Sequence, residues 1–305
     1  MNSVNSLEIF NKHKETKPSI VTIGTFDGIH EGHTSLLTNM INHKNNLIPI
    51  VISFNKSPKD IINKNNSKMI FELNEKKKII QEIGIEKIID IDFNQEIQEL
   101  NCKDFIEILK YSLNMEVLIL GEDTLLGKDR KGYQNGLIEI LNSFGSKLIP
   151  IPNKKDIKSK ISSSQIKKSI SDGDIEKANL LLGRKFFIKG KVIEGAKIGA
   201  SLGYPTANIQ YNDDLVIPKD GVYKTETHVD GETYLSATSI GHNPTFNGSE
   251  KTIETFIIDF EEDIYNKDIK VSFLEFIRDQ IKFNDVESLK KRMSDDINYI
   301  VIGKG

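Results

Sequence analysis

The sequence predicts an α/β domain followed by a small β domain. In the first half, short apolar runs alternate with longer segments whose apolar residues recur at helical spacing, which is typical of a parallel sheet flanked by helices. In the second half, turns rich in Gly, Pro, Asn and Asp separate closely spaced strand-like segments, which favours a small antiparallel barrel. The 305 residues are enough for two domains that each bury a core.

The first domain is expected to alternate strand and helix. Its strands are predicted at 20–23, 47–54, 87–92 and 117–121, and its helices at 33–45, 74–83 and 103–113. This order gives a Rossmann-like parallel sheet, whose ligands bind in the turns that follow the strands. The turn after the strand at 20–23 is therefore the first place to look for a site.

The boundary between the two domains is expected near Gly183. A serine-rich stretch can cap a helix that Asp172-Gly173-Asp174 ends, and a second helix at 175–182 stops at Gly183. We therefore place the domains at 1–182 and 183–305.

Five strands and a terminal helix are predicted in the second domain. The strands are expected at 186–192, 221–229, 233–240, 252–259 and 269–277. The helix is expected to begin at an Asn284 cap, with Glu287 three residues later, and to carry an apolar stripe from Val286 to Ile300. Such a stripe is most often used for packing.

Composition and charge exclude several classes of protein. Hydrophobic residues make up 38% and charged residues 28%, as in ordinary globular proteins, and the net charge of −3 gives no general attraction to nucleic acid or to an anionic membrane. Cys102 is the one cysteine, so an intrachain disulfide and a cysteine-rich metal site are excluded, and a buried thiol is expected. The polar N-terminus and the short apolar runs indicate a soluble, cytoplasmic protein.

The turn after the first strand, Gly24 to His33, has the features of a phosphate-binding loop. Its glycines allow the backbone to approach a phosphate, and the helix that follows presents free N–H groups to an anion. His30 and His33 can stabilise charge that develops on a phosphate. The alternative is a glycine-rich turn that contains two histidines by chance. Neither G-x-G-x-x-G nor a P-loop occurs, and the histidine spacing does not suit a helical zinc site.

This segment resembles the signature of the H-x-G-H nucleotidyltransferases, in the version carried by bacterial bifunctional riboflavin kinase/FAD synthetases. The resemblance implies that His30 and His33 bind the phosphates of ATP and act in catalysis. It also implies that the loop holds the nucleotide for attack by the FMN phosphate, through Gly24, Thr25, Phe26, Asp27 and Gly28.

Two further segments resemble the same family. Gly121-Glu122-Asp123 looks like the loop near nucleotide and flavin, which implies binding roles for Gly121 and Asp123. Residues 161–167 look like the serine-rich motif that contacts ATP phosphates, which implies binding roles for Ser162, Ser163, Ser164 and Lys167.

The chain departs from the family pattern at the rim of this site. Thr124 and Leu126 replace phenylalanines, Ser164 and Lys167 replace Thr and Arg, and Ser57-Pro58-Lys59 replaces His-Pro-Arg. Lys keeps the charge of Arg but loses its two-pronged grip on phosphate, and lost aromatic rings remove stacking surface. A kinase whose transferase domain has reduced or lost activity therefore remains an alternative.

The second domain has its own candidate site. Thr206 and Asn208 lie two residues apart, so on an extended segment their side chains point the same way. A hydroxyl and an amide oxygen are hard ligands that suit Mg²⁺ bound to phosphates. Glu254 is a carboxylate in an apolar run; it is an outward-facing charge or, beside the other two, a candidate general base for a hydroxyl nucleophile.

From Gly183 to about Phe283 the chain closely resembles riboflavin kinases. The matching motifs include Leu-Gly-x-Pro-Thr-Ala-Asn at 202–208, Pro218 to Tyr223, and Gly-x-Asn-Pro-Thr-Phe at 241–246. The resemblance implies that Thr206 and Asn208 coordinate Mg²⁺ with ATP and that Glu254 activates the ribityl 5′-hydroxyl. It also implies binding roles for Gly199, Gly203, Pro205 and Arg278, although a surface salt bridge would also explain Arg278.

The sequence thus predicts phosphorylation of riboflavin to FMN, followed by adenylation of FMN to FAD. The expected partners are riboflavin, FMN, FAD, ATP and Mg²⁺, with no nucleic acid and no membrane; the oligomeric state is left open. The alternatives are a kinase alone, a nucleotidyltransferase for another phosphate acceptor, and a flavin-binding regulator without turnover. Thr206, Asn208 and Glu254 argue against the regulator.

Overall fold

The protein forms two compact units in the computed structural model, which describes residues 8–133, 135–153, 160–195, 198–242 and 251–303. One unit comprises Met1–Ser67 and Glu72–Ser163, and the other comprises Lys68–Phe71 and Ser164–Gly305. The sequence-based boundary at 182/183 stays a prediction. The motif at 243–246 lies outside the described residues.

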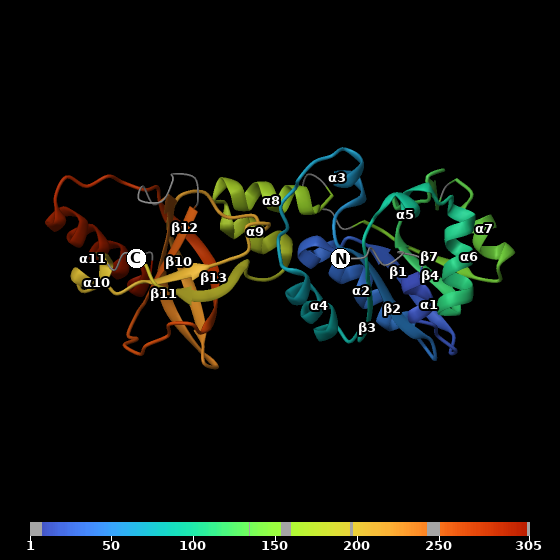
Figure 1. The fold of residues 1–305 in the computed structure, drawn as a ribbon, viewed down its shortest axis with the longest axis horizontal. Helices are drawn as coiled ribbons and strands as arrows, with labels where there is room; N and C mark the ends of the chain where they lie inside the picture. Colours follow the sequence, from blue (N-terminus) through green and yellow to red (C-terminus); the bar gives the residue numbers. More distant parts are fainter. Residues whose placement is uncertain (1–7, 134, 154–159, 196–197, 243–250, 304–305) are drawn as a thin grey trace. The chain divides into compact units, whose positions relative to one another are not determined.

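The first unit is built on a five-stranded parallel sheet with the order β3-β2-β1-β4-β7 (Figure 1). Its strands are β1 (Ser19–Gly24), β2 (Ile48–Phe54), β3 (Lys87–Ile91), β4 (Met115–Gly121) and β7 (Lys147–Ile151). The predicted α/β class is confirmed, but β7 was not predicted. Pro150 interrupts its pattern, and the strand tolerates Pro150 because it lies at the edge of the sheet, where an N–H is not required.

The helices of this unit include the three that the periodicity predicts. These are α2 (Glu31–His43), α4 (Leu73–Glu82) and α6 (Cys102–Leu113). The others are too short to show a helical repeat: η1 (Asp27–Ile29), α1 (Glu8–Lys12), α3 (Pro58–Ile62), α5 (Gln95–Glu99) and α7 (Leu137–Ser143), with a small hairpin of β5 (Leu125–Leu126) and β6 (Lys131–Gly132). Cys102 is fully buried, as expected; burial first, and then the charge of Asp129, raise the pKa of its thiol to about 12.

The second unit contains a closed barrel of six antiparallel strands with the order β10-β11-β12-β9-β8-β13, as predicted. The strands are β8 (Phe187–Ile193), β9 (Ala207–Gln210), β10 (Gly221–Val229), β11 (Glu232–His242), β12 (Lys251–Ile257) and β13 (Asp268–Arg278). The prediction missed β9 and the single turn α10 (Ile198–Ser201), because four residues carry too little pattern.

Three longer helices complete the barrel unit: α8 (Ser163–Asp172), α9 (Ile175–Leu182) and α11 (Val286–Ile302). The α9 helix stops at Gly183 in the left-handed conformation, as predicted. The predicted Asn284 cap of α11 is wrong by one residue. The carboxylate of Asp285 accepts a hydrogen bond of 2.7 Å from the backbone N–H of Ser288 and caps the helix instead.

The segment 68–71 and helix α9 both pack on the barrel. The backbone N–H of Met69 donates to Asp214 and its carbonyl accepts from Val216, at 2.7 and 2.8 Å. The side chain of Asn179 on α9 donates to the carbonyl of Phe273 and accepts from the N–H of Phe186, at 2.9 and 2.6 Å. These hydrogen bonds explain why both segments belong to the barrel unit.

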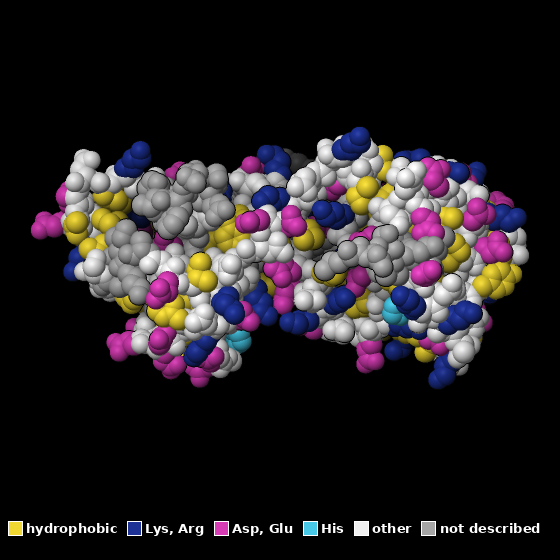
Figure 2. Space-filling view, in the orientation of Figure 1, with side chains coloured by type: hydrophobic (Ala, Val, Ile, Leu, Met, Phe, Trp, Pro, Cys, Tyr) yellow, Lys and Arg dark blue, Asp and Glu magenta, His cyan; other side chains and the backbone are white. Residues whose placement is uncertain are grey.

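Charged residues of both signs are mixed along the sequence, and the surface shows the same mixture (Figure 2). Figure 2 shows Lys, Arg, Asp and Glu side chains interspersed over the visible face, as expected for a solvated surface on which lysines alternate with acids. Among the described residues, no helix combines the length and the apolar character that a membrane span requires.

A chain of hydroxyl groups crosses the barrel interior. Thr225, Thr227, Ser236, Thr238 and Thr255 are all fully buried. The Thr225 hydroxyl, here called the hub, is the middle one of the five and contacts the Ser236 and Thr238 hydroxyls at 2.9 and 2.7 Å. Thr227 continues the chain at one end and Thr255 at the other, with contacts of 2.8 and 2.9 Å. Each hydroxyl therefore exchanges water for a protein partner.

We predict that the barrel depends on the hub of this chain more than on its end. Thr225→Val keeps the shape but leaves two buried hydroxyls short of a partner, so it should destabilise the barrel by about 2–3 kcal/mol. Thr227→Val removes one contact and should cost about 1 kcal/mol. Urea unfolding of the full chain, followed by hydrogen exchange in β10 and β11, measures both. Equal costs would contradict the hub.

Candidate active sites

The loop after β1 turns sharply at residues that are not all glycine. Phe26 has φ 52° and Ile29 has φ 41°, in the left-handed region that side chains rarely adopt, and Gly28 between them has φ 79°. Phe26 is 2% exposed and Ile29 is fully buried, so packing holds both residues in this conformation. The loop is therefore a fixed structure whose shape depends on buried side chains.

This turn places two histidines at the start of α2. His30 is the N-cap residue, and its Nδ1 accepts a long hydrogen bond of 3.4 Å from the backbone N–H of His33. Because Nδ1 accepts, the proton of a neutral His30 ring lies on Nε2, which can donate to an anion. The two rings stack with 3.8 Å between centroids, and Phe26 packs against His33 at 5.2 Å.

The histidines line a cavity of about 310 Å³. The cavity lies where β1, β4 and β7 end, and β1 and β4 flank the point at which the strand order reverses. Open parallel sheets bind ligands at this position. The structure brings eight of the predicted residues to its walls: Gly24, Phe26, His30, His33, Gly121, Asp123, Ser162 and Ser163.

The other predicted residues of this half do not line the cavity. Thr25, Asp27, Gly28, Ser164 and Lys167 are absent from its walls. Asp27 supports the loop through its carbonyl, which accepts a hydrogen bond of 2.9 Å from the Ser163 hydroxyl. Of the two positions where phenylalanine was expected, Thr124 lines the cavity and Leu126 is buried in the hydrophobic core.

Two lysines and an asparagine near this cavity were not predicted as site residues. Lys160 and Asn153 line its walls, and Lys160 forms an ion pair with Asp123. Burial acts to raise the pKa of the Asp123 carboxyl, but the hydrogen bond and charge of Lys160 outweigh it and hold that pKa below its usual value. Lys76 lies behind the loop, with its ammonium 3.2 Å from the carbonyl oxygen of Thr25. Lys76 lies in a run of three lysines that looks like a solvated helix face, so its burial gave no signal in the sequence.

The second site joins the residues predicted in the barrel unit. The Thr206 hydroxyl donates a hydrogen bond of 3.3 Å to Oε2 of Glu254. Asn208 on β9 lies directly opposite Glu254 on β12, so the two side chains lie on the same face of the barrel wall. A hydroxyl, an amide and a carboxylate thus converge at one place, as the spacing of the sequence predicts for the first two.

Glycines let the backbone press against these side chains. A Cβ at Gly195 would lie 2.0 Å from the amide nitrogen of Asn208, and one at Gly199 would lie 2.4 Å from the carbonyl oxygen of Tyr204. Gly203 turns the chain with φ 88°. The backbone N–H of Tyr204 closes this turn on the carbonyl of Gly199 at 2.9 Å. The turn leads directly into Pro205 and Thr206.

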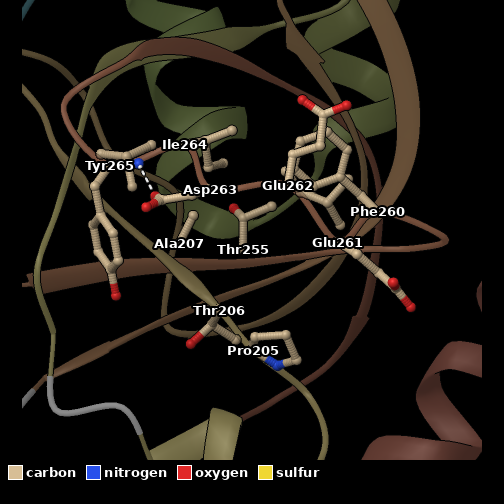
Figure 3. Close-up of a pocket in the computed structure, with 12 residues that line it drawn as sticks. Pro205, Thr206, Ala207, Thr255, Phe260, Glu261, Glu262, Asp263, Ile264 and Tyr265 are labelled. Atoms are coloured by element: carbon tan, nitrogen blue, oxygen red, sulfur yellow. Dashed lines mark hydrogen bonds between the residues drawn. The ribbon is translucent and has the colours of Figure 1, made fainter.

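A cavity of about 250 Å³ lies beside Thr206. Figure 3 shows Pro205 and Thr206 on one side of it and the segment from Asp263 to Tyr265 on the other. Its walls combine apolar side chains with the three consecutive carboxylates of Glu261, Glu262 and Asp263. Residues 260–265 were not predicted to belong to a site, because they follow the strand as an ordinary acidic loop.

Arg278 forms a largely buried ion pair. Its Nε and Nη2 donate to the carboxylate of Asp296 at 2.6 to 3.0 Å, and its Nη1 donates to the carbonyl of Asp279 at 3.1 Å. The Arg278 and Asp296 side chains are only 11% and 6% exposed, so this is not the surface salt bridge that was the alternative interpretation. The pair joins β13 to α11. A role of Arg278 near the flavin stays a prediction.

Comparison with known proteins also divides the chain into an N-terminal and a C-terminal part. Residues 12–165 match the family model described as FAD synthetase, and residues 182–301 match the one described as riboflavin kinase. The bifunctional riboflavin kinase/FMN adenylyltransferase of Listeria monocytogenes is 33% identical over 91% of this chain and 90% of its own length. The protein of the same name from Buchnera aphidicola subsp. Schizaphis graminum is 36% identical over 96% of both chains.

The chain belongs to the bifunctional riboflavin kinase/FMN adenylyltransferase family. The fold agrees with a solved structure from Streptococcus pneumoniae that is described as a macrolide-efflux protein. It is 31% identical, has a TM-score of 0.86, and the match covers 95% of this chain and 96% of that one. Both units of the chain therefore match domains of this family of enzymes. The resemblance to bifunctional riboflavin kinase/FAD synthetases that the motifs indicated is confirmed.

The donor set of the barrel site fits a magnesium ion bound with a nucleotide. Thr206, Asn208 and Glu254 present oxygen atoms, which Mg²⁺ prefers. No group of three or more His, Cys, Asp and Glu side chains could hold a metal ion anywhere in the described ranges. Mg²⁺ commonly uses few protein ligands and completes its shell with water and phosphate oxygens.

We predict that Gly195→Ala selectively impairs the kinase activity for which the family is named. The added Cβ overlaps the end of the Asn208 side chain, which can rotate away at little cost in stability but leaves its place beside Glu254. A displacement of about 1 Å at a site can cost about 100-fold in rate. Steady-state kinetics of riboflavin phosphorylation measure the loss, and FMN adenylation by the same sample is the control. An unchanged kinase rate would exclude a need for Asn208 in this position.

Proposed function

We propose that this chain makes FMN from riboflavin in its barrel unit and FAD from FMN in its parallel-sheet unit. The observation that carries the proposal is the presence of two constellations of candidate site residues in one member of this family. One is the hydrogen bond from Thr206 to Glu254, with Asn208 opposite Glu254. The other is the stacked pair of His30 and His33 in the cavity at the carboxyl ends of the parallel strands.

In the kinase reaction we assign Glu254 as the general base. Its Oε2 accepts from Thr206, which orients the carboxylate, and Oε1 would take the proton of the ribityl 5′-hydroxyl. The hydroxyl oxygen then attacks the γ-phosphorus of ATP, and ADP leaves with the bond to its β-phosphate oxygen broken. Thr206 and Asn208 are assigned to hold Mg²⁺, which neutralises phosphate charge when bound. The cavity lined by Glu261, Glu262 and Asp263 suits an uncharged ring better than a phosphate chain.

In the transferase reaction we assign the loop after β1 to the phosphates of ATP. A phosphate oxygen of FMN attacks the α-phosphorus, and pyrophosphate leaves. His30 Nε2, His33 and the first N–H groups of α2 would stabilise the charge that develops. Ser162 and Lys160, which also line the cavity, would supply further donors, while the Ser163 hydroxyl supports the loop at the Asp27 carbonyl. Because both reactions consume ATP, we place the enzyme in the cytoplasm as part of the same proposal.

A time course with the purified chain tests the proposed function. Riboflavin, ATP and Mg²⁺ are incubated with the protein, and the flavins are separated by chromatography. We expect FMN first and FAD after it. FMN that accumulates without FAD, even when FMN is supplied directly, would remove the transferase half of the proposal.

We predict that Glu254→Gln separates the two activities. The amide keeps the size of the side chain but cannot accept a proton, so FMN formation should fall by about 100-fold or more, the usual contribution of a general base. Adenylation of supplied FMN should stay within about twofold of the unsubstituted protein, since Glu254 lies in the other unit. A parallel loss of both activities would contradict the assignment.

His33→Ala should have the reverse effect. Removing one donor to a developing charge costs about 100- to 1,000-fold in rate, so FAD formation from FMN should fall by this factor. Riboflavin phosphorylation serves as the control for folding, because His33 belongs to the parallel-sheet unit. The yield of FAD, followed by chromatography, decides; an unchanged yield would mean that this loop is not catalytic.

A further inference from the structure

Lys76 is a buried lysine behind the loop that follows β1. Its side chain extends from α4, and the residue is only 6% exposed. The ammonium donates to the carbonyl oxygen of Thr25 and to that of Phe54, at 3.2 Å each. Thr25 is the first residue after β1 and Phe54 is the last of β2, so one side chain joins the carboxyl ends of two neighbouring strands.

Two carboxylates near Lys76 favour its ammonium form, but burial outweighs them in the pKa. Burial lowers the pKa of Lys76 below the ordinary lysine value, while the carboxylates of Asp90 on β3 and Asp27 on η1 act against this effect, and Lys77 adds to it. Lys77 is itself paired with Asp90 at 2.6 Å. The ammonium therefore lies among two carbonyl dipoles and two carboxylates, all of which attract a positive charge.

The neighbours of Lys76 on the same helix show that its burial is specific. Lys77 and Lys78 have side chains that are 37% and 56% exposed, and each pairs with a carboxylate. A lysine is rarely buried unless it is paired, because desolvation of an ammonium is costly. Packing alone would be served by a methionine of similar length. The charge and the donors of Lys76 are thus the features that need an explanation.

The loop that Lys76 holds is the one assigned to the nucleotide. The carbonyl of Thr25 immediately precedes the left-handed Phe26, and the Ser163 hydroxyl holds the carbonyl of Asp27 on the other side of that residue. The carbonyl oxygens and carboxylates around Lys76 make the region behind the loop negative, which would repel a polyphosphate bound at the loop. A cation behind the loop offsets that repulsion.

We propose that Lys76 is a positioning residue for the adenylation reaction, which fixes the loop from Gly24 to His33 and offsets the negative charge behind it. The proposal rests on the proposed transferase function. Lys76 acts through the loop and need not touch the nucleotide.

Three variants of the full chain test this role: Lys76→Met, Lys76→Arg, and Lys78→Met as a matched control on the same helix. For Lys76→Met we expect kcat/KM of FMN adenylation to fall about 100-fold, as for other losses of positioning. Lys76→Arg keeps the charge and the donors and should recover activity to within about tenfold. Lys78→Met should match the unsubstituted protein. Phosphorylation of riboflavin by the same samples controls for folding.

The pH profile separates a charge from a merely structural contact. As the pH rises through the lowered pKa of Lys76, the ammonium loses its proton, so adenylation by the unsubstituted protein should decline. Lys76→Arg should not show this decline, since Arg stays charged over the whole range. Asp27, Asp90 and Lys77 are present in both proteins and cancel in the comparison.

Two results would overturn the role of Lys76. One is adenylation by Lys76→Met within about threefold of the unsubstituted protein, far from the expected effect of lost positioning. The other is an equal loss of both activities and of thermal stability in both Lys76 variants, which would indicate a structural lysine. If the unsubstituted protein forms no FAD, the proposed function itself fails.

Discussion

The backbone of the turn between β1 and α2 is the constraint on which the parallel-sheet site depends. Phe26 and Ile29 have left-handed φ values, and each such residue costs about 1–3 kcal/mol. Burial of the Phe26 ring and of the Ile29 side chain, with hydrogen bonds to the carbonyls of Thr25 and Asp27, outweighs that cost. Because the turn is held from several sides, it can present His30 at the start of α2 without rearranging.

The order of the strands explains why distant segments meet at this turn. The β1 strand lies between β2 and β4. From β1 the chain adds β2 and β3 on one side, and it then adds β4 and β7 on the other side of β1. The end of β1 therefore meets the ends of β4 and β7, and brings Gly24 to the same cavity as Gly121 and Asn153. A parallel sheet collects loops that are more than a hundred residues apart at one edge.

Much of this arrangement could be predicted, and the omissions have physical causes. The apolar runs identified four strands of the sheet. The fifth strand, β7, was not predicted because Pro150 interrupts its pattern, and so Asn153, which follows β7, was not predicted to line the cavity. Thr206 and Asn208 could be paired by their spacing, but only the barrel register brings Glu254 opposite Asn208. Alternation cannot say which face of a strand is buried when both faces are polar, and so the hydroxyl chain through Thr225 gave no signal.

Burial of Lys76 shows most clearly what sequence patterns omit. Hydrogen bonds from a charged group contribute about 1.5–3 kcal/mol each, whereas desolvation of an ammonium costs several kcal/mol, so two bonds to carbonyls give little net stability. Lys76, Lys77 and Lys78 are the same residue type, so the sequence does not distinguish them. Only their different directions around the α4 helix axis decide which side chain points inward.

The two sites meet the same electrostatic demand in different ways. In the barrel, Thr206, Asn208 and Glu254 supply oxygen atoms, so under the proposed function a bound cation would balance charge on the triphosphate. In the parallel-sheet unit, Lys160 pairs with Asp123 at the wall of the cavity, and Lys76 is buried behind the loop. Under the proposed function, these two lysines would supply part of the positive charge from the protein itself. The kinase reaction should therefore be the more sensitive of the two to the concentration of the divalent ion, and the transferase reaction the more sensitive to the protonation of lysine.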